Sequence, residues 1–372
     1  MELNYNLFAL FETVGAVQAL TLGMLLIVLN KRQYKSTWFL GLFLIFFALG
    51  TVPHVLESLN AYTVYPELYL LPLDFFWFYF PLFYLYTQYA CIFSNQKKKF
   101  WVLYPGMVAF GFQLYLFFLP HETKLSVVQT MGYDIYTFIK LVYGLSVGIY
   151  TLKLLNRHKV EVYNSFSFVK SKELAWGRIY LSYALLGFLL YTLLFHTIPE
   201  SFLARLFFVS FDLILIYWIS YHGVKQQNVR SLFALKERYD FENEKPSEKN
   251  EIPLPPEKSL EELMGRIHSY LTKSESYTHP ELTIVDLAEK LKNHPKRISA
   301  AINNVQHQNF NSYINQLRVK KAETLLKNEE TGNLSIEGIG NEVGFHSKSA
   351  FYSAFKKETG TTPLKYKVYV DA

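Results

Sequence analysis

Long apolar segments fill the first 224 residues and limit what this chain can fold into. Seven of them approach the roughly 20 residues that a helix needs to cross the hydrocarbon core of a membrane. Inside lipid, every backbone polar group must be satisfied within its own segment, which favours helices over buried strands. We therefore expect a seven-helix transmembrane bundle, with spans near residues 7–29, 38–56, 69–93, 100–119, 135–155, 176–198 and 202–224.

The rest of the chain has a different composition. Over the whole sequence 51% of the residues are hydrophobic and 17% are aromatic, which is high for a soluble protein. From residue 225 onward, however, charged and apolar residues alternate as in a water-soluble domain. We therefore predict an all-α protein with a transmembrane domain in residues 1–224, a juxtamembrane helix and flexible linker in 225–258, and a further domain in 259–372.

Lysine and arginine residues between the spans predict the orientation of the bundle, because such residues gather in cytoplasmic loops. They follow the first, third, fifth and seventh spans, whereas the alternate loops hold only Lys124 against four glutamates. We therefore expect the N-terminus outside and residue 225 onward in the cytoplasm. The basic residues after the odd-numbered spans are Lys31, Arg32, Lys35, Lys97, Lys98, Lys99, Arg157, Lys159, Lys170, Lys172, Lys225 and Arg230.

Six ionisable residues lie inside the predicted spans, where a charge is costly and is often functional. They predict a ligand-sensing pocket that opens to the outside, to which the aromatic run from Asp74 to Tyr84 would contribute, with Pro81 able to kink its helix. An equally good interpretation is that polar groups near helix ends only reach the interfacial water. The six residues are Glu12, His54, Asp74, Lys140, His196 and Asp212.

This part of the sequence shows no motif that carries catalysis. It has no metal-ligand spacing, nucleophile triad or phosphate-binding loop, and the single cysteine, Cys91, excludes an internal disulfide bond. We therefore expect no catalytic residues, no metal site, no cofactor and no enzymatic activity.

The linker has the composition of a flexible tether. Residues 240–258 combine charge with four prolines and almost no large apolar side chains. Just before it, Val229, Leu232 and Phe233 have helical spacing and predict a short amphipathic helix. Because a flexible tether transmits torque poorly, we expect a signal to change how close two copies of the chain lie.

A helical pattern with clear start signals begins near residue 259. Ser259 with Glu262, and Thr283 with Asp286, have the spacing of a capping box. Pro295 suits the first turn of the next helix, which follows a short break. The inner face of that helix is expected to consist of Ile298, Ala301, Ile302 and Val305.

The same pattern recurs about 52 residues further along the chain. Ser335 and Ser347 are placed to cap two short helices, and Gly344 can adopt the left-handed conformation that the turn between them needs. The buried faces of these helices are expected to contain Ile336, Ile339, Gly340, Val343, Phe351 and Phe355.

The segment from about residue 260 to 368 resembles the DNA-binding domain of the AraC/XylS family of bacterial regulators. The stretch NFNSYINQLRVKKAETLL resembles the entry of the family's linker helix, and GFHSKSAFYSAFKKETGTTPLKYK resembles its second motif. The resemblance implies an all-α domain with two recognition helices that enter successive major grooves. Because the family is bacterial, the predicted spans would lie in the bacterial inner membrane. Gly338 and Gly340 depart from the family pattern, at a cost of up to about 1 kcal/mol each, so we expect a looser second motif.

Charge agrees with this reading, because residues 290–372 hold 13 Lys or Arg against 7 Asp or Glu. By helical position, five side chains on the first recognition helix, including Ala300, and four on the second face outward and are expected to contact bases, chiefly Lys296, Asn303, Lys348 and Ser349. Four further lysines are expected to contact phosphates, although a solvated surface would account for them equally well. The base-reading set is Lys296, Arg297, Ser299, Asn303, Lys348, Ser349, Tyr352 and Ser353, and the phosphate set is Lys320, Lys321, Lys356 and Lys357.

Together these features predict a membrane-bound regulator of transcription whose partners are double-stranded DNA, the lipid bilayer and an unidentified signal ligand. The amphipathic segment 260–271 offers a surface for a homodimer, and RNA polymerase is a further candidate partner. The alternatives are a transporter or membrane enzyme that carries a DNA-binding domain, and a bundle that serves only as an anchor.

Overall fold

The computed structural model describes residues 3–29, 35–92, 99–170, 172–197, 202–225, 257–327 and 334–371. These residues form helices and connecting segments, with one isolated antiparallel bridge between Phe166 and Thr283. The chain divides into two compact units. The first consists of Met1–His158 and Leu174–Arg230, and the second of Lys159–Glu173 and Ser231–Ala372.

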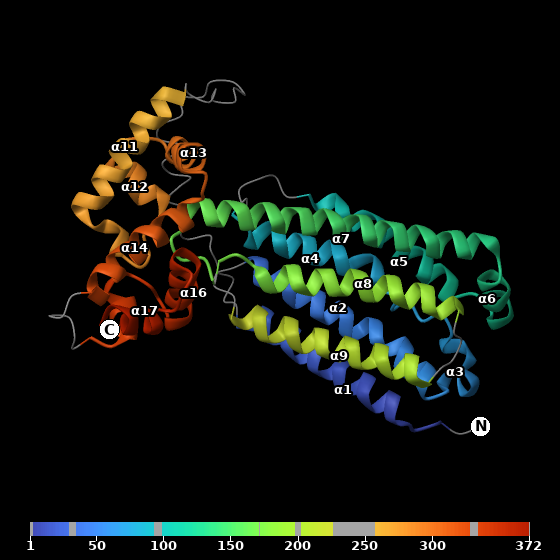
Figure 1. Ribbon diagram of the computed structural model, residues 1–372. Coiled ribbons are helices and arrows are strands. Elements are labelled where there is room, and N and C mark those ends of the chain that lie inside the picture. Colours follow the sequence, from blue (N-terminus) through green and yellow to red (C-terminus); the bar gives the residue numbers. More distant parts are fainter. Residues whose placement is uncertain are drawn as a thin grey trace. The chain divides into compact units, whose positions relative to one another are not determined.

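The first unit is a bundle of long helices that run along a common direction (Figure 1). Helix α2 packs against α1 and α4, and α9 packs against α1 and α8. The helices are α1 (Leu7–Val28), α2 (Lys35–Ser58), α3 (Ala61–Val64), α4 (Phe76–Ala90), α5 (Tyr104–Phe117), α6 (His121–Val128), α7 (Met131–Ser165), α8 (Ala175–Thr197) and α9 (Phe202–Lys225), with short 3-10 turns η1 (Pro66–Leu68) and η2 (Phe100–Leu103).

Small and aromatic residues explain how the bundle packs. A side chain added at Gly23 of α1 would come within 2.8 Å of the carbonyl oxygen of Gly41 on α2, so only glycine allows these backbones to approach so closely. Deeper in the unit, Phe43 and Phe83 are buried and both contact Tyr180 of α8. Aromatic edges and faces therefore fill the space between α2, α4 and α8.

Several helices of the first unit are suited to a membrane. Among the described residues, five helical segments are long and apolar enough to cross one. The predicted span 69–93 appears as the 15-residue helix α4, and α8 contributes a shorter apolar stretch, Ala175–Leu190. The five segments are Leu7–Val28, Lys35–Ser58, Phe100–Phe117, Met131–Ser165 and Leu206–Gly223.

In the second unit, one long helix belongs to two separate hydrophobic cores. The first half of α14 contributes Ile314 to a core that it shares with α11, α12 and α13, which we call the first lobe. Its second half contributes Ala322 to a core shared with α15 and α16, the second lobe. The helices are α11 (Glu257–Ser274), α12 (Ile284–Lys290), α13 (Pro295–Gln306), α14 (Phe310–Lys327), α15 (Ile336–Glu342), α16 (Lys348–Thr359) and α17 (Pro363–Asp371), with the turn η3 (Ser276–Thr278).

Most of the predicted start signals are confirmed. Thr283 and Asp286 form a complete capping box at α12, and Pro295 opens α13. The side chains of Ser335 and Ser347 accept hydrogen bonds from the backbone at the starts of α15 and α16. The prediction for Ser259 is wrong, because α11 begins two residues earlier, at Glu257.

Close packing explains why Gly340 and Gly344, in and after α15, are glycines. A side chain at Gly340 would come within 2.8 Å of the ring of Phe351, so only glycine lets α15 approach α16 this closely. The packing gained by this close approach offsets the low helix propensity of glycine. Gly344 adopts the predicted left-handed conformation, with φ of +96°. A side chain there would also come within 2.3 Å of the carbonyl oxygen of Thr278. The turn between α15 and α16 thus packs directly on η3.

We predict that Gly344→Ala destabilises the second unit by more than about 2 kcal/mol, because left-handed strain adds to a collision with backbone. Gly360→Ala is the matched control. Gly360 is also left-handed, with φ of +77°, but no heavy atom lies within 4 Å of its added side chain, so we expect a loss of about 1 kcal/mol. Urea-dependent proteolysis of the full-length chain in detergent measures both values, and equal losses would contradict the packing of Gly344 on η3.

Candidate nucleic-acid interface

The first candidate recognition helix, α13, presents a polar face. Lys296 is exposed, and Ser299 and Asn303 are half-exposed on the same side of the helix. The Asn303 amide donates a hydrogen bond to Ser299 Oγ at 3.4 Å. Arg297 differs from these three residues, because its guanidinium donates to Ser259 Oγ on α11 at 3.4 Å. The structure thus groups Lys296, Ser299 and Asn303 and directs Arg297 toward α11.

The second candidate recognition helix, α16, has a comparable face. Lys348, Ser349 and Ser353 are exposed, whereas Tyr352 is half-buried. The ammonium of Lys348 lies 5.8 Å from the centre of the Tyr352 ring, within the range of a cation–π contact. On the opposite side, Phe351 and Phe355 are fully buried, as expected. The helix therefore separates a core face from a polar face.

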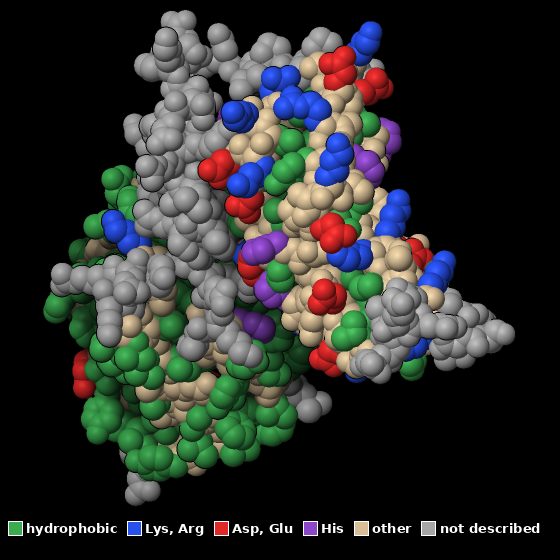
Figure 2. All heavy atoms as spheres, turned by 90° about the vertical axis from the view of Figure 1, so that its left-hand side faces the viewer, with side chains coloured by type: hydrophobic (Ala, Val, Ile, Leu, Met, Phe, Trp, Pro, Cys, Tyr) green, Lys and Arg blue, Asp and Glu red, His purple; other side chains and the backbone are tan. Residues whose placement is uncertain are grey.

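The four lysines assigned to phosphate contacts have different surroundings. Lys320, Lys356 and Lys357 are exposed. Lys321 is half-buried and forms an ion pair with Glu275, with 2.6 Å between Nζ and Oε2. On the face shown in Figure 2, Lys and Arg side chains are spread over the second unit, whereas hydrophobic side chains dominate the first.

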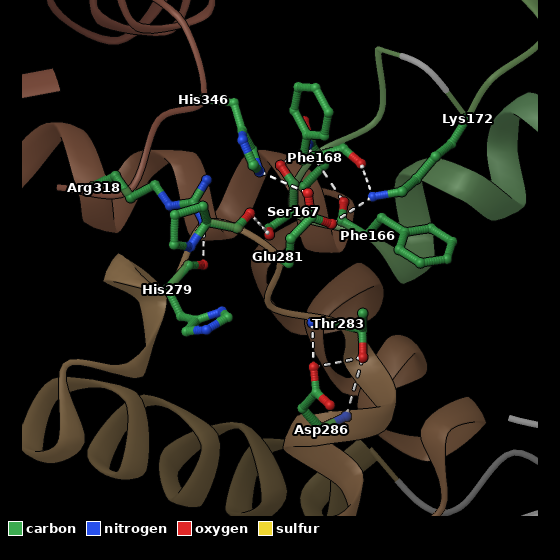
Figure 3. Close-up of polar contacts among 12 residues, drawn as sticks. Phe166, Ser167, Phe168, Lys172, His279, Glu281, Thr283, Asp286, Arg318 and His346 are labelled. Atoms are coloured by element: carbon green, nitrogen blue, oxygen red, sulfur yellow. Dashed lines mark hydrogen bonds and ion pairs between the residues drawn. The ribbon is translucent and has the colours of Figure 1, made fainter. Parts of the chain in front are cut away.

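A buried arginine that the sequence analysis did not single out connects α14 to the segment before α12. Arg318 is 2% exposed, and its guanidinium donates to the carbonyl oxygens of Tyr277 at 2.7 Å and His279 at 2.9 Å (Figure 3). It also lies 5.6 Å from the ring centre of Phe345 in the second lobe. Burial lowers the pKa of Arg318 to about 10, with Glu281 opposing the shift, so the side chain stays charged at neutral pH.

In the first unit, the structure brings together two of the six predicted sensing residues. Lys140 Nζ on α7 lies 2.6 Å from Asp74 Oδ2, just before α4. Gln113 of α5 exchanges hydrogen bonds with the backbone of Asp74, at 3.1 Å and 3.0 Å. Three helices therefore meet at one charged residue.

The other four predicted sensing residues do not join this cluster in the contacts that are described. Glu12 of α1 accepts a hydrogen bond from Ser58 at 2.6 Å, and Asp212 lies in the middle of α9. His54 is exposed on α2. His196 belongs to α8, but its side chain lies outside the described residues.

A groove of about 690 Å³ lies along α1 and α9. None of the six predicted sensing residues is among the described residues that line it, nor is the aromatic run from Asp74 to Tyr84. Its lining is mostly apolar and consists of Phe11, Ser210, Leu213, Ile214, Tyr217, Trp218, Tyr221 and His222.

Comparison with known proteins gives matches to the C-terminal region. Residues 287–368 match a family model described as a helix-turn-helix domain. The chain is 30% identical over 112 residues to the Msm operon regulatory protein of Streptococcus mutans, covering 29% of this chain and 39% of that protein. It is 29% identical over 108 residues to the HTH-type transcriptional regulator AlkR of Acinetobacter baylyi, covering 29% of this chain and 32% of that protein. The matches thus span well under half of each relative.

A solved structure also matches this region. The C-terminal domain of AraT, a response regulator from Geobacillus stearothermophilus, is 28% identical, and the match covers 32% of this chain and 88% of that one. Its TM-score of 0.26 is too low to support an argument about the fold. Over its C-terminal part, this chain is therefore similar to transcription regulators with a helix-turn-helix domain.

Proposed function

We propose that this protein is a membrane-bound transcription regulator that binds specific DNA sequences through a bipartite helix-turn-helix domain. One observation carries the proposal: the helix-turn-helix match over residues 287–368 contains two capped helices, α13 and α16, each with a polar outer face and a buried inner face. The relatives over this region are named as an operon regulatory protein and a transcriptional regulator.

The contacts with DNA divide into two kinds. Lys296, Asn303, Lys348 and Ser349 read bases in the major groove, because they lie on the outer faces of α13 and α16. Lys320, Lys356 and Lys357 are exposed and neutralise phosphates. Arg297 and Lys321 contribute less, because their side chains already bind Ser259 and Glu275.

The membrane half of the proposal comprises seven spans, with the N-terminus outside and the helix-turn-helix domain in the cytoplasm. Five helical segments with sufficient length and hydropathy support it, as does the clustering of basic residues after alternate spans. The cluster around Asp74 is the best candidate for the site that responds to a signal, because it joins α4, α5 and α7 through charged and polar contacts.

We predict that Lys348→Ala weakens binding of the full-length chain, in lipid nanodiscs, to a duplex selected from a random library by about 1–3 kcal/mol, with little effect on random duplex. Lys357→Ala should weaken binding to both duplexes. It should also reduce by about one the steepness with which the logarithm of the binding constant falls with the logarithm of the salt concentration. The control is Lys273→Ala on α11, an exposed lysine that should change neither value. Equal effects of Lys348→Ala on selected and random duplex would contradict base reading by α16.

We also predict that Asp74→Ala and Lys140→Ala each change the output of a reporter gene, because each substitution leaves one charge of the pair without its partner. The double variant should lie closer to the wild type than either single variant. Lys153→Ala, an exposed lysine on the same helix α7, is the control. Unchanged output in all variants at matched protein levels would support a bundle that serves only as an anchor.

A further inference from the structure

The segment that connects α7 to α8 belongs to the second unit, together with the helix-turn-helix domain. We call residues 166–172 the docking loop and residues 279–283 the junction segment. Phe166 pairs with Thr283 in an antiparallel bridge, and the backbone amide of Ser167 donates to Leu282 O at 3.1 Å. The Ser167 hydroxyl donates to Pro280 O at 3.2 Å (Figure 3). Phe166 and Ser167 of the docking loop thus pair with the junction segment at one isolated bridge and its neighbouring hydrogen bonds.

A buried amide fixes the docking loop on the first lobe. Asn311, at the start of α14, donates from Nδ2 to the carbonyl oxygens of Phe166 at 3.4 Å and Ser167 at 2.7 Å. Phe166 and Ser167 are each 3% exposed, and Asn311 is 8% exposed. Buried polar groups of this kind are costly when they lose their partners, so the loop has a strong preference for this position.

The docking loop also reaches the second lobe. Lys172 Nζ lies 2.8 Å from one carboxylate oxygen of Glu281, and His346 Nε2 lies 2.7 Å from the other. The ring of Phe168 packs on that of His346, with 4.2 Å between centroids. His346 directly precedes Ser347, the N-cap of α16. The loop therefore contacts residues at or next to the N-caps of helices in both lobes.

We propose that the docking loop relays the state of the membrane helices to the DNA-binding lobes. This inference rests on the proposed function. The loop is covalently continuous with α7 and α8, so a movement of either helix pulls on its contacts with the junction segment. Docking ties α12, α14 and the start of α16 in one relative arrangement, and two recognition helices can enter successive grooves only in a matching arrangement. Docked and undocked forms therefore bind DNA with different affinities.

This relay differs from the route expected from the sequence. From the flexible linker, we expected a signal to act by changing how close two copies lie. The docking loop provides a direct connection within one copy, through Lys172, Glu281 and Asn311. The connection is independent of the linker residues 240–256, which lie outside the described part of the chain.

A disulfide cross-link tests docking in the full-length chain in nanodiscs. In a Cys91→Ser background, which removes the single native cysteine, Phe166→Cys is combined with Thr283→Cys. Residues that face each other in an antiparallel bridge are close enough for mild oxidation to join them. The control combines Phe166→Cys with Ser335→Cys, another exposed helix N-cap. We expect the first pair to cross-link and the control not to, and equal yields would overturn docking.

The same variant tests the coupling to DNA. On a duplex selected from a random library by the wild-type full chain, we expect the oxidised and reduced forms to differ in affinity by about fivefold or more. Equal affinities would overturn the relay while leaving DNA binding intact. If the library yields no preferred duplex at all, the proposed function fails, and the relay fails with it.

Charge reversal provides a second test that leaves the N-cap of α12 unchanged. Lys172→Glu should shift the affinity for the selected duplex, because it places a second negative charge beside Glu281. Adding Glu281→Lys restores a pair of opposite charges and should move the affinity back toward the wild-type value. Lys170→Glu is the matched control, since Lys170 is exposed in the same loop. An equal effect of Lys170→Glu and Lys172→Glu would overturn the assignment of Lys172 to the relay.

Discussion

The arrangement of the two lobes depends on the hydrogen bonds of one buried, charged side chain, that of Arg318 in the second unit. A guanidinium that is 2% exposed needs partners, and it finds them in the carbonyl oxygens of Tyr277 and His279. Those partners hold in place the short stretch from η3 to α12. Gly344 packs against Thr278 in that stretch, and the docking loop pairs with its final residues. One charged helix residue thus holds the stretch on which both the turn before α16 and the docking loop pack.

Electrostatics has a different role in each unit. In the first unit, Asp74 is paired with Lys140, because an isolated charge among apolar helices is expensive. In the second unit, most lysines are left exposed, where they can meet phosphates. The network of Lys172, Glu281 and His346 combines both features, since its polar contacts are partly buried and yet lie next to the start of α16.

Local signals in the sequence predicted the local structure well. The caps at Thr283, Ser335 and Ser347, and the left-handed Gly344, each depend on neighbouring residues, so spacing alone identified them. Contacts between distant segments gave no such signal. Nothing in the sequence near Arg318 or Lys172 indicates which carbonyl or carboxylate oxygen each side chain will contact. The side chains of Arg297 and Lys321 are likewise directed by distant partners, Ser259 on α11 and Glu275 just before η3. The start of α11 was misplaced because Ser259 has the right spacing for a cap but binds Arg297 instead.

We propose that α13 and α16 of one chain occupy neighbouring major grooves. Methylation-interference footprinting of a selected duplex, bound to the full-length chain in nanodiscs, tests this arrangement. We expect two patches of guanines whose modification blocks binding, separated by about one helical turn, or 10 base pairs. A single patch, or binding that is indifferent to sequence, would contradict it.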